Sequence, residues 1–228
     1  MNTFQQFFYY FSENGSYVFI QFMRHFLISI YGVLLAAVIG IPIGIIISKY
    51  AKLSGFIITI ANIIQTIPAL ALLAMLMLVM GLGQTTVVVA VFLYSLLPII
   101  KNTYTGINNI NHDLIDSGKG MGMTKVQVLY MIELPLSLSV MIAGIRIALV
   151  VAIGITAIGA FIGAGGLGDI IIRGTNATDG AAIILAGAIP TALMAILVDF
   201  ILGQLEKRID PVKRNKKLTK PSIQSLDD

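Results

Sequence analysis

The chain has 228 residues, of which 57% are hydrophobic and only 11% charged, with a net charge of +4 and a mean hydropathy of +0.92. An average soluble domain carries about 25% charged residues, so this chain has too few polar side chains to cover a water-facing surface. The composition excludes a soluble enzyme and a disordered chain, and it indicates one membrane domain with short tails.

Four long runs contain no Asp, Glu, Lys or Arg, namely residues 25–48, 53–100, 147–168 and 180–198. A spanning helix needs about 20 apolar residues, and the second run can hold two spans with a turn at Gly81-Leu82-Gly83-Gln84. In lipid, only helix bundles and closed barrels pair all their backbone groups. Because these runs do not alternate in polarity as barrel strands do, we predict an all-α, polytopic membrane helix bundle. The five predicted spans are residues 26–48, 55–80, 85–100, 137–162 and 181–202.

The predicted membrane domain covers residues 22–203, and polar segments flank and interrupt it. Residues 1–21 are a polar-aromatic lead-in that either lies on the membrane surface or forms a short extra helix. The first eleven residues contain no basic side chain, unlike the start of a signal peptide, so we expect the first span to be retained. Residues 101–131 form the long polar connection inside the domain, and residues 204–228 form a basic tail that we expect to be disordered from residue 218.

Basic residues are distributed unequally between the two sides of the predicted bundle. With the N-terminus outside, 12 of the 15 Lys and Arg residues fall in cytoplasmic segments, two fall in outer segments, and Arg146 lies inside the fourth span. Basic loops prefer the cytoplasmic side of a membrane. The bias therefore predicts an outside N-terminus and a cytoplasmic C-terminus, and it explains the net charge without nucleic acid.

The sequence provides little for a catalytic or cofactor site. It has no cysteine, and its two histidines, His25 and His112, are far apart, so neither a metal site nor Ser-His-Asp chemistry is expected. No Gly-x-x-x-x-Gly-Lys-Ser/Thr sequence occurs, so the chain cannot bind ATP through a P-loop. We predict no cofactor and no enzymatic activity, and any ATP hydrolysis would belong to a separate polypeptide.

The polar connection predicts two short helices that meet at a glycine turn. Asp113 and Asp116 are expected in the first turn of the first helix, because acidic side chains favour the positive end of the helix dipole. Gly118, Gly120 and Gly122 let the chain end that helix and turn. Thr124 and Gln127 have the spacing of a capping box for the second helix, which Pro135 is expected to break or bend. Such a rigid knob suits docking into a partner, and an ordinary amphipathic loop is the alternative.

The same segment resembles the cytoplasmic loop of permease subunits from binding-protein-dependent ABC importers. In that family Glu-Ala-Ala is followed by three residues, Gly, nine residues and Ile-x-Leu-Pro. Here Gly122 is followed by nine residues and then Ile132-Glu133-Leu134-Pro135, whereas Asp116-Ser117-Gly118 replaces Glu-Ala-Ala. The resemblance implies the type I importer permease fold and a loop that couples to an ATPase. The coupling residues it implies are Asp116, Ser117, Gly118, Gly120, Gly122, Ile132, Leu134 and Pro135.

Within that family the chain is similar to the glycine betaine, carnitine and choline permeases. Residues 62–73 and 94–106 carry this likeness, whereas residues 163–169 are shared with methionine permeases. The resemblance implies a bacterial cell-membrane subunit that works with two ATPase subunits, a second permease and an extracellular substrate-binding lipoprotein. A permease for methionine or another small amino-acid-like solute is one alternative, and an ion-coupled secondary transporter is the other.

Several residues in or beside the spans are candidates for the transport pathway or its gate. Arg146 is a charge well inside a span, and Asp199 in the fifth span is its candidate partner. Pro68, preceded by Gln65 and Thr66, removes a backbone hydrogen bond and predicts either a kink that lines the passage or a Ser or Thr of a neighbouring helix that fills the gap. The tight turn at Gly165-Gly166 could shape an outer gate, and Gly40 and Gly44 favour close helix packing.

Overall fold

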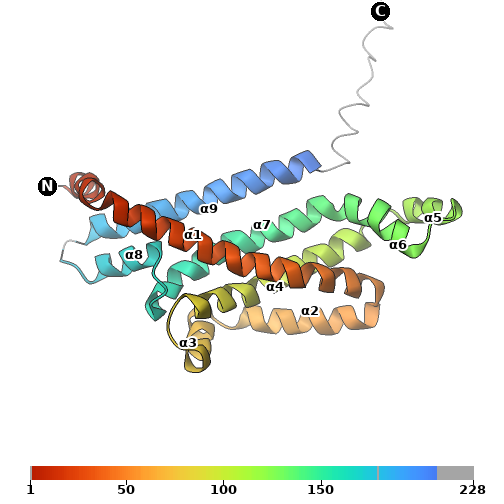
Figure 1. Cartoon of the computed structure of the whole chain (residues 1–228), viewed down its shortest axis with the longest axis horizontal. Coiled ribbons are helices and arrows are strands. Elements are labelled where there is room, and N and C mark those ends of the chain that lie inside the picture. Colours follow the sequence, from red (N-terminus) through yellow and green to blue (C-terminus); the bar gives the residue numbers. More distant parts are fainter. Residues whose placement is uncertain (1, 179, 210–228) are drawn as a thin grey trace, which may run out of the picture.

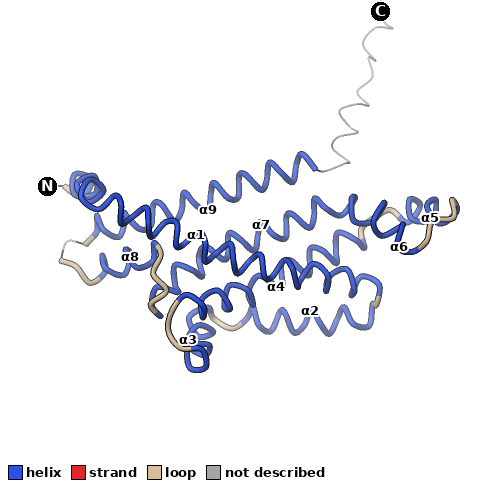
Figure 2. The backbone as a smooth tube through the Cα atoms, viewed as in Figure 1, coloured by secondary structure: helices blue, strands red, loops and turns tan. Residues whose placement is uncertain are grey.

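The computed structural model describes residues 2–178 and 180–209, and within them the chain is helical with short connections (Figures 1 and 2). The predicted disorder beyond residue 218 lies outside the described residues. The α-helices are α1 (Thr3–Lys49), α2 (Ala51–Thr66), α3 (Ala69–Met80), α4 (Gln84–Asn108), α5 (His112–Gly120), α6 (Lys125–Val128), α7 (Leu134–Ile158), α8 (Leu167–Thr175) and α9 (Ala181–Ile209). A π-helical turn, η1 (Leu129–Glu133), precedes α7, and a 3-10 turn, η2 (Gly159–Ile162), follows it.

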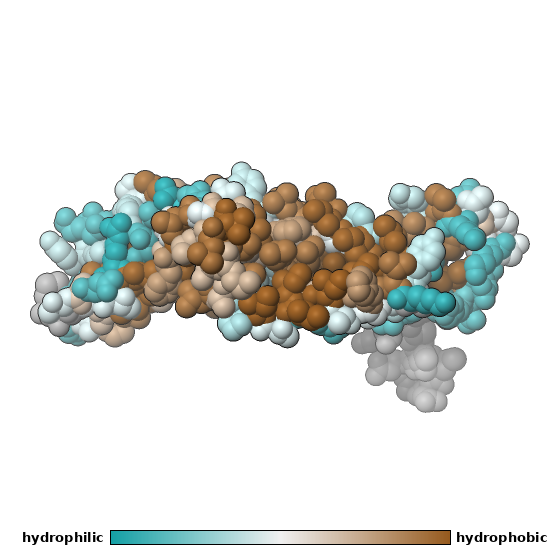
Figure 3. All heavy atoms as spheres, turned by 90° about the horizontal axis from the view of Figure 1, so that it is seen from below, coloured by the Kyte–Doolittle hydropathy of each residue, from teal (hydrophilic) through white to brown (hydrophobic). Residues whose placement is uncertain are grey.

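Within the described residues, four helical stretches are long and apolar enough to cross a membrane, and a bent pair makes a fifth if it counts as one span. The stretches are α1, α4, the continuous unit Lys125–Ile162 and α9. The molecule is elongated, with a hydrophobic band across its middle and hydrophilic residues at both ends (Figure 3). This surface confirms the membrane helix bundle predicted from composition.

The second predicted span, residues 55–80, is sharply bent at Pro68. It is divided into α2 and α3, whose axes differ by 95°, and α3 leaves the direction of the bundle (Figure 1). Pro68 has no N–H, and Ile67 before it adopts an extended conformation with φ −67° and ψ 127°. The Tyr94 hydroxyl of α4 donates a hydrogen bond to the Ile67 carbonyl. A neighbouring helix therefore fills the gap, as one alternative predicted, but with tyrosine instead of Ser or Thr.

Pro135 does not break the helix, which was one of the two outcomes predicted for it. Residues Lys125–Ile162 run as one unit, in which the π-helical turn ends two residues before the proline. In this turn the Leu134 N–H bonds to the Leu129 carbonyl, one residue further back than in an α-helix. The wider turn relieves the clash that a proline ring makes with the carbonyl four residues earlier.

Close contacts between α1, α4 and α7 form the centre of the bundle, and glycines permit them. A Cβ atom on Gly44 would lie 2.6 Å from the Cβ of Thr103, and one on Gly40 would lie 3.1 Å from Ile99. Gly144 of α7 meets α4 in the same way, with a virtual Cβ 2.7 Å from the Cβ of Asn102. The predicted packing role of these residues is therefore met, because larger side chains would force the helices apart.

The Tyr94–Ile67 hydrogen bond can be tested by Tyr94→Phe. We expect this variant to lose about 1–3 kcal/mol of stability, because the Ile67 carbonyl is left unpaired in an apolar setting. Thermal unfolding in detergent, followed by circular dichroism, should show a lower melting temperature. Tyr31→Phe is the matched control, since Tyr31 is 56% exposed. Equal melting of Tyr94→Phe and the unmodified chain would contradict this account of the break.

Candidate coupling and gating sites

The polar connection forms a helical knob, defined here as α5, the following turn and α6. The N-cap residue of α5 is Asn111, whose side chain accepts a hydrogen bond from the Asp113 N–H at 2.9 Å. This cap was not predicted, although Asn is a favoured residue at that position. Asp113 lies in the first turn as expected, whereas Asp116 lies beyond it and pairs with Lys119 at 3.0 Å.

The three glycines of the knob serve different structural purposes. Gly118 lies inside α5 instead of ending it, and a Cβ atom there would lie only 2.6 Å from Cδ1 of Ile132. The structure therefore brings Gly118 and Ile132 into contact, which packs α5 against η1. Gly122 turns the chain with φ +83°, a conformation that favours glycine. Gly120 is exposed, with no neighbour within 4 Å of a virtual Cβ.

The second helix of the knob begins as predicted. The Thr124 hydroxyl accepts a hydrogen bond from the Gln127 N–H at 3.3 Å, and the Gln127 side chain accepts one from the Thr124 N–H at 2.7 Å. This reciprocal pair is a capping box. It fixes the start of the unit that continues through η1 into α7, so α6, the second helix of the knob, is part of that long helical unit.

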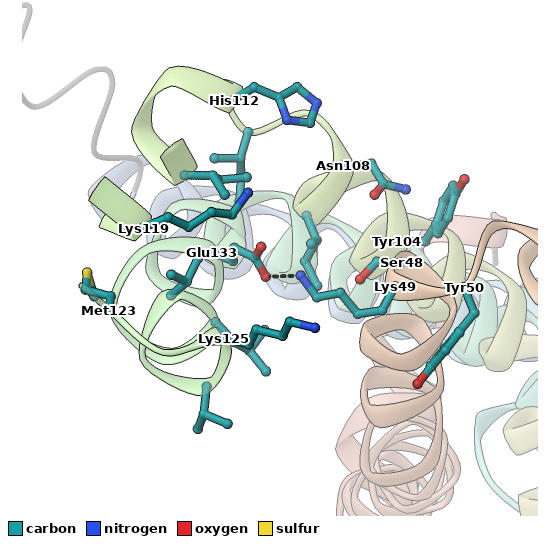
Figure 4. Close-up of a pocket in the computed structure, with 16 residues that line it drawn as sticks. Ser48, Lys49, Tyr50, Tyr104, Asn108, His112, Lys119, Met123, Lys125 and Glu133 are labelled. Carbon is teal, nitrogen blue, oxygen red and sulfur yellow. Dashed lines mark hydrogen bonds and ion pairs between the residues drawn. The ribbon is translucent and has the colours of Figure 1, made fainter. Parts of the chain in front are cut away.

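An ion pair between Lys49 and Glu133 connects η1, which directly follows the knob, to the end of α1 (Figure 4). Glu133 is buried in η1, with only 5% of its surface exposed, and Lys49 is the last residue of α1. The pair borders a groove of about 1110 Å³ whose lining includes Lys119 and Lys125. Sequence reasoning missed this pair. The sequence did contain a signal for it. Glu133 is the single carboxylate between Asp116 and Asp169, in a mostly apolar stretch. A charge that becomes buried there requires a partner of opposite charge.

At the opposite end of the bundle, the predicted tight turn packs on α1. Gly163, Gly165 and Gly166 have φ values of +76°, +73° and +80°. The Gly166 N–H donates to the Gln21 side chain at 2.7 Å, and a Cβ on Gly165 would lie 2.7 Å from Nη1 of Arg24. The turn joins η2 to α8, and its contacts with α1 make it the tight glycine turn that the sequence predicts.

Helix α8, which follows the turn, is bound to the lead-in part of α1. The Tyr17 hydroxyl donates to Asp169 at 2.6 Å, Asp169 also accepts from Arg173 at 2.9 Å, and the Arg173 guanidinium lies 4.9 Å from the Tyr17 ring centroid. Burial, followed by the hydrogen bond to Asp169, raises the pKa of Tyr17 to about 12. The hydroxyl therefore stays protonated and donates throughout the physiological pH range. Neither α8 nor these contacts were predicted, because they join segments far apart in sequence.

Arg146 pairs with Asp199, as predicted, with 3.3 Å between Nε and the carboxylate. It has a second partner that was not predicted, Glu206, at 3.1 Å from Nη1. A Cβ on Gly203 would lie 2.8 Å from the same Nη1, so this glycine leaves room for the guanidinium. Asp199, Gly203 and Glu206 are spaced four and three residues apart and therefore share one face of α9. The ion pairs join α7 to α9.

The candidate pathway residues lie at three separate places in the bundle. Gln65, Thr66 and Pro68 lie at the α2–α3 break, where the Thr66 hydroxyl donates to the Ile63 carbonyl at 2.7 Å. Arg146 and Asp199 lie between α7 and α9, and Gly165 and Gly166 lie in the turn before α8. The structure brings together the members of each group, and it does not join the groups into one site.

Comparison with known proteins places this geometry in a family. Residues 19–211 match the family of binding-protein-dependent transport system inner membrane components. The chain is 64% identical to the glycine betaine/carnitine/choline transport system permease protein OpuCD of Bacillus subtilis, over 95% of this chain and 94% of the relative. It is 62% identical to the choline transport system permease protein OpuBD of the same organism, over 95% and 96%.

A solved structure with the same fold is the MetNI methionine ABC transporter in an inward-facing conformation. The two chains align with a TM-score of 0.73 at 23% identity, over 85% of this chain and 96% of the solved chain. This similarity confirms the predicted fold of a type I importer permease. The chain belongs to the family of binding-protein-dependent inner membrane components.

The Arg146 ion pairs can be tested by Arg146→Met. Arg146 is 31% exposed, so we expect a stability loss of about 1–2 kcal/mol, below the 3–5 kcal/mol of a fully buried pair. The second change Glu206→Gln should restore part of the loss, because it removes the carboxylate left without a partner. Thermal unfolding in detergent measures both effects, with the exposed Arg208→Met as the control. An unchanged melting temperature would contradict a structural role, and normal uptake by folded Arg146→Met would exclude a gating role.

Proposed function

We propose that this chain forms half of the membrane pathway of an ATP-driven importer for a quaternary-amine osmoprotectant such as glycine betaine, carnitine or choline. The observation that carries the proposal is 64% identity, over nearly the whole chain, to a permease named for these three solutes. The methionine alternative has less support, because the methionine transporter resembles this chain in fold at 23% identity. The family depends on a binding protein, which a secondary transporter would not need.

In this proposal the knob receives the motion of the ATPase subunits. It comprises most of the predicted coupling residues, including Asp116, Gly118 and Gly122, and it continues without interruption into α7. The unit Lys125–Ile162 has 38 residues, or about 57 Å of helix at 1.5 Å per residue. It ends at the glycine turn that packs on α1. A displacement of the knob would therefore reach the opposite end of the bundle along one helical unit.

Two ion-pair contacts would distribute this displacement to neighbouring helices. The Lys49–Glu133 pair connects the base of the knob to α1, and Arg146 connects the middle of α7 to Asp199 and Glu206 on α9. Charged pairs that are partly buried hold a defined geometry, because separating them leaves an uncompensated charge in an apolar setting. We assign Arg146 and Asp199 to this transmission, and Gln65, Thr66, Pro68, Gly165 and Gly166 to the pathway and its outer gate.

The partners in this proposal are two ATPase subunits, a second permease, identical or homologous, and an extracellular binding lipoprotein. The chain has no P-loop sequence, so the ATPases must be separate chains. The knob would face the cytoplasm, and the turn before α8 would face the docked binding protein, which is the orientation predicted from the basic residues. Trp, the strongest aromatic surface for a quaternary ammonium group, is absent from the sequence, so selectivity would reside mainly in the binding protein.

Uptake competition tests the substrate and the energy source together. In cells that lack other osmoprotectant carriers, this transporter should take up labelled glycine betaine, and unlabelled carnitine or choline should compete. Excess methionine should not compete, and collapse of the proton gradient at maintained ATP should leave uptake intact. Competition by methionine alone would favour the amino-acid alternative, and loss of uptake with the gradient would favour an ion-coupled carrier.

A further inference from the structure

Helix α1 is much longer than a membrane crossing requires. Its 47 residues correspond to about 70 Å at 1.5 Å per residue, whereas the hydrocarbon core is about 30 Å thick. The charge-free run begins only at His25, so the preceding part, residues 3–24, must lie outside the core or along its surface. The first turns of α1 run in a different direction from the rest of the helix (Figure 1). Gly15, between Asn14 and Ser16, is the kind of position where helices bend.

This N-terminal part is an ordered helix from its first turn. The Asn2 side chain accepts from the Phe4 N–H at 2.9 Å, and the Gln5 side chain accepts from the Asn2 N–H at 3.2 Å. These two bonds form a capping box, which stabilises a helix start. The lead-in is therefore the beginning of α1 and not a separate short helix.

The lead-in helix has two aromatic faces, and only one of them is covered by the part of the chain that the structure describes. Phe7, Tyr10, Phe11 and Tyr17 pack against the hydrophobic core of the bundle. The other face exposes Phe4, Phe8 and Tyr9, with 71%, 69% and 60% of their surfaces accessible. No charged side chain occurs before Glu13. A helix start with three large exposed aromatic rings and no charge is poorly suited to water.

The same helix exposes an apolar side again beyond the polar exposed residues Ser12, Glu13 and Ser16. Further along the helix the exposed apolar side chains are Phe19, Ile20, Met23, Leu27 and Tyr31. The last three are spaced four residues apart and so follow one side of the helix. Leu27 and Tyr31 fall within the charge-free run, where the exposed side chains of a spanning helix contact lipid. One helix therefore carries both the aromatic face and a lipid-facing side, with a short polar segment between them.

We propose that Phe4, Phe8 and Tyr9 insert into the headgroup–acyl boundary of the bilayer on the side of the N-terminus, so that the lead-in is an interfacial anchor. Aromatic side chains concentrate at this boundary, and a helix with an apolar face lies along it with that face buried. The anchor would hold Tyr17 and Gln21 at a defined depth. Through Asp169 and the Gly166 N–H, these two residues would fix α8 and the glycine turn relative to the membrane. This inference does not depend on which solute is transported.

The absence of tryptophan from the chain permits a direct test. A single Phe8→Trp variant of the full chain, reconstituted in nanodiscs, should emit at short wavelength and be quenched by lipids brominated on their acyl chains. Bromine near the headgroup should quench it more than bromine near the chain end. Phe7→Trp is the matched control from the adjacent, covered position and should be quenched less. Tyr31→Trp supplies a deeper lipid reference, and the exposed Val126→Trp supplies a water reference.

Emission from Phe8→Trp like that of Val126→Trp, without quenching, would overturn the proposal because it would place this face in water. The alternative is that another protein covers the exposed aromatic face. It is tested in the assembled transporter in its native membrane, with the photo-crosslinking residue benzoylphenylalanine in place of Phe8. Photolysis should produce phospholipid adducts, identified by mass spectrometry. Protein adducts without lipid adducts would overturn the proposal and assign the face to a partner chain. Failure of osmoprotectant uptake would leave both readouts unaffected, so the two proposals fail independently.

Discussion

A bilayer provides no water to the backbone, so each N–H and C=O group inside it must find a partner in the protein. The irregular parts of this chain show how the requirement is met. At the α2–α3 break the Ile67 carbonyl is paired with the Tyr94 hydroxyl, and at the glycine turn before α8 the Gly166 N–H is paired with Gln21. After α3, the Gly83 N–H bonds to the Ile162 carbonyl at 2.9 Å. Each irregularity is thereby tied to another helix, and the connections that permit bends also hold the bundle together.

The same requirement connects the two ends of the molecule. A helix that crosses the membrane cannot be interrupted without leaving backbone groups unpaired. Pro135 could cause such an interruption, because it has no N–H and its ring crowds the preceding turn. The π-helical turn at Leu129–Glu133 keeps Lys125–Ile162 continuous, and it also positions Glu133 against Lys49. Helix α6, α7 and η2, which ends at the glycine turn before α8, therefore belong to one continuous helical unit. Glycines at the crossings with α4 keep this element close to its neighbours.

Local rules predicted the features that depend on residues near in sequence. The charge-free runs located the membrane helices, and the capping box at Thr124 appeared as expected. One contact between distant residues, Arg146–Asp199, was also predicted, because a charge inside the membrane needs an opposite charge.

The other contacts between distant residues were missed, among them Tyr94 with Ile67 and Tyr17 with Asp169. The π-helical turn before Pro135 is local, but no rule applied to the sequence predicted it. Glu206 was missed because the fifth span was predicted to end at residue 202, whereas α9 continues to Ile209.

The central claim is that the knob moves with α7 and so couples ATP hydrolysis to transport. The most direct measurement is the number of solutes imported per ATP hydrolysed by the reconstituted transporter carrying Gly118→Leu. A leucine there would need space that is now filled by the Ile132, Met123 and Val128 side chains, whose nearest atoms lie 2.6, 3.2 and 3.8 Å from a virtual Cβ, so it would disturb the packing of α5 on η1. Gly55→Leu, in the open surface of α2, is the control. The account predicts a much lower ratio for Gly118→Leu and a normal ratio for the control. A normal ratio for Gly118→Leu, in a transporter that assembles normally, would contradict it.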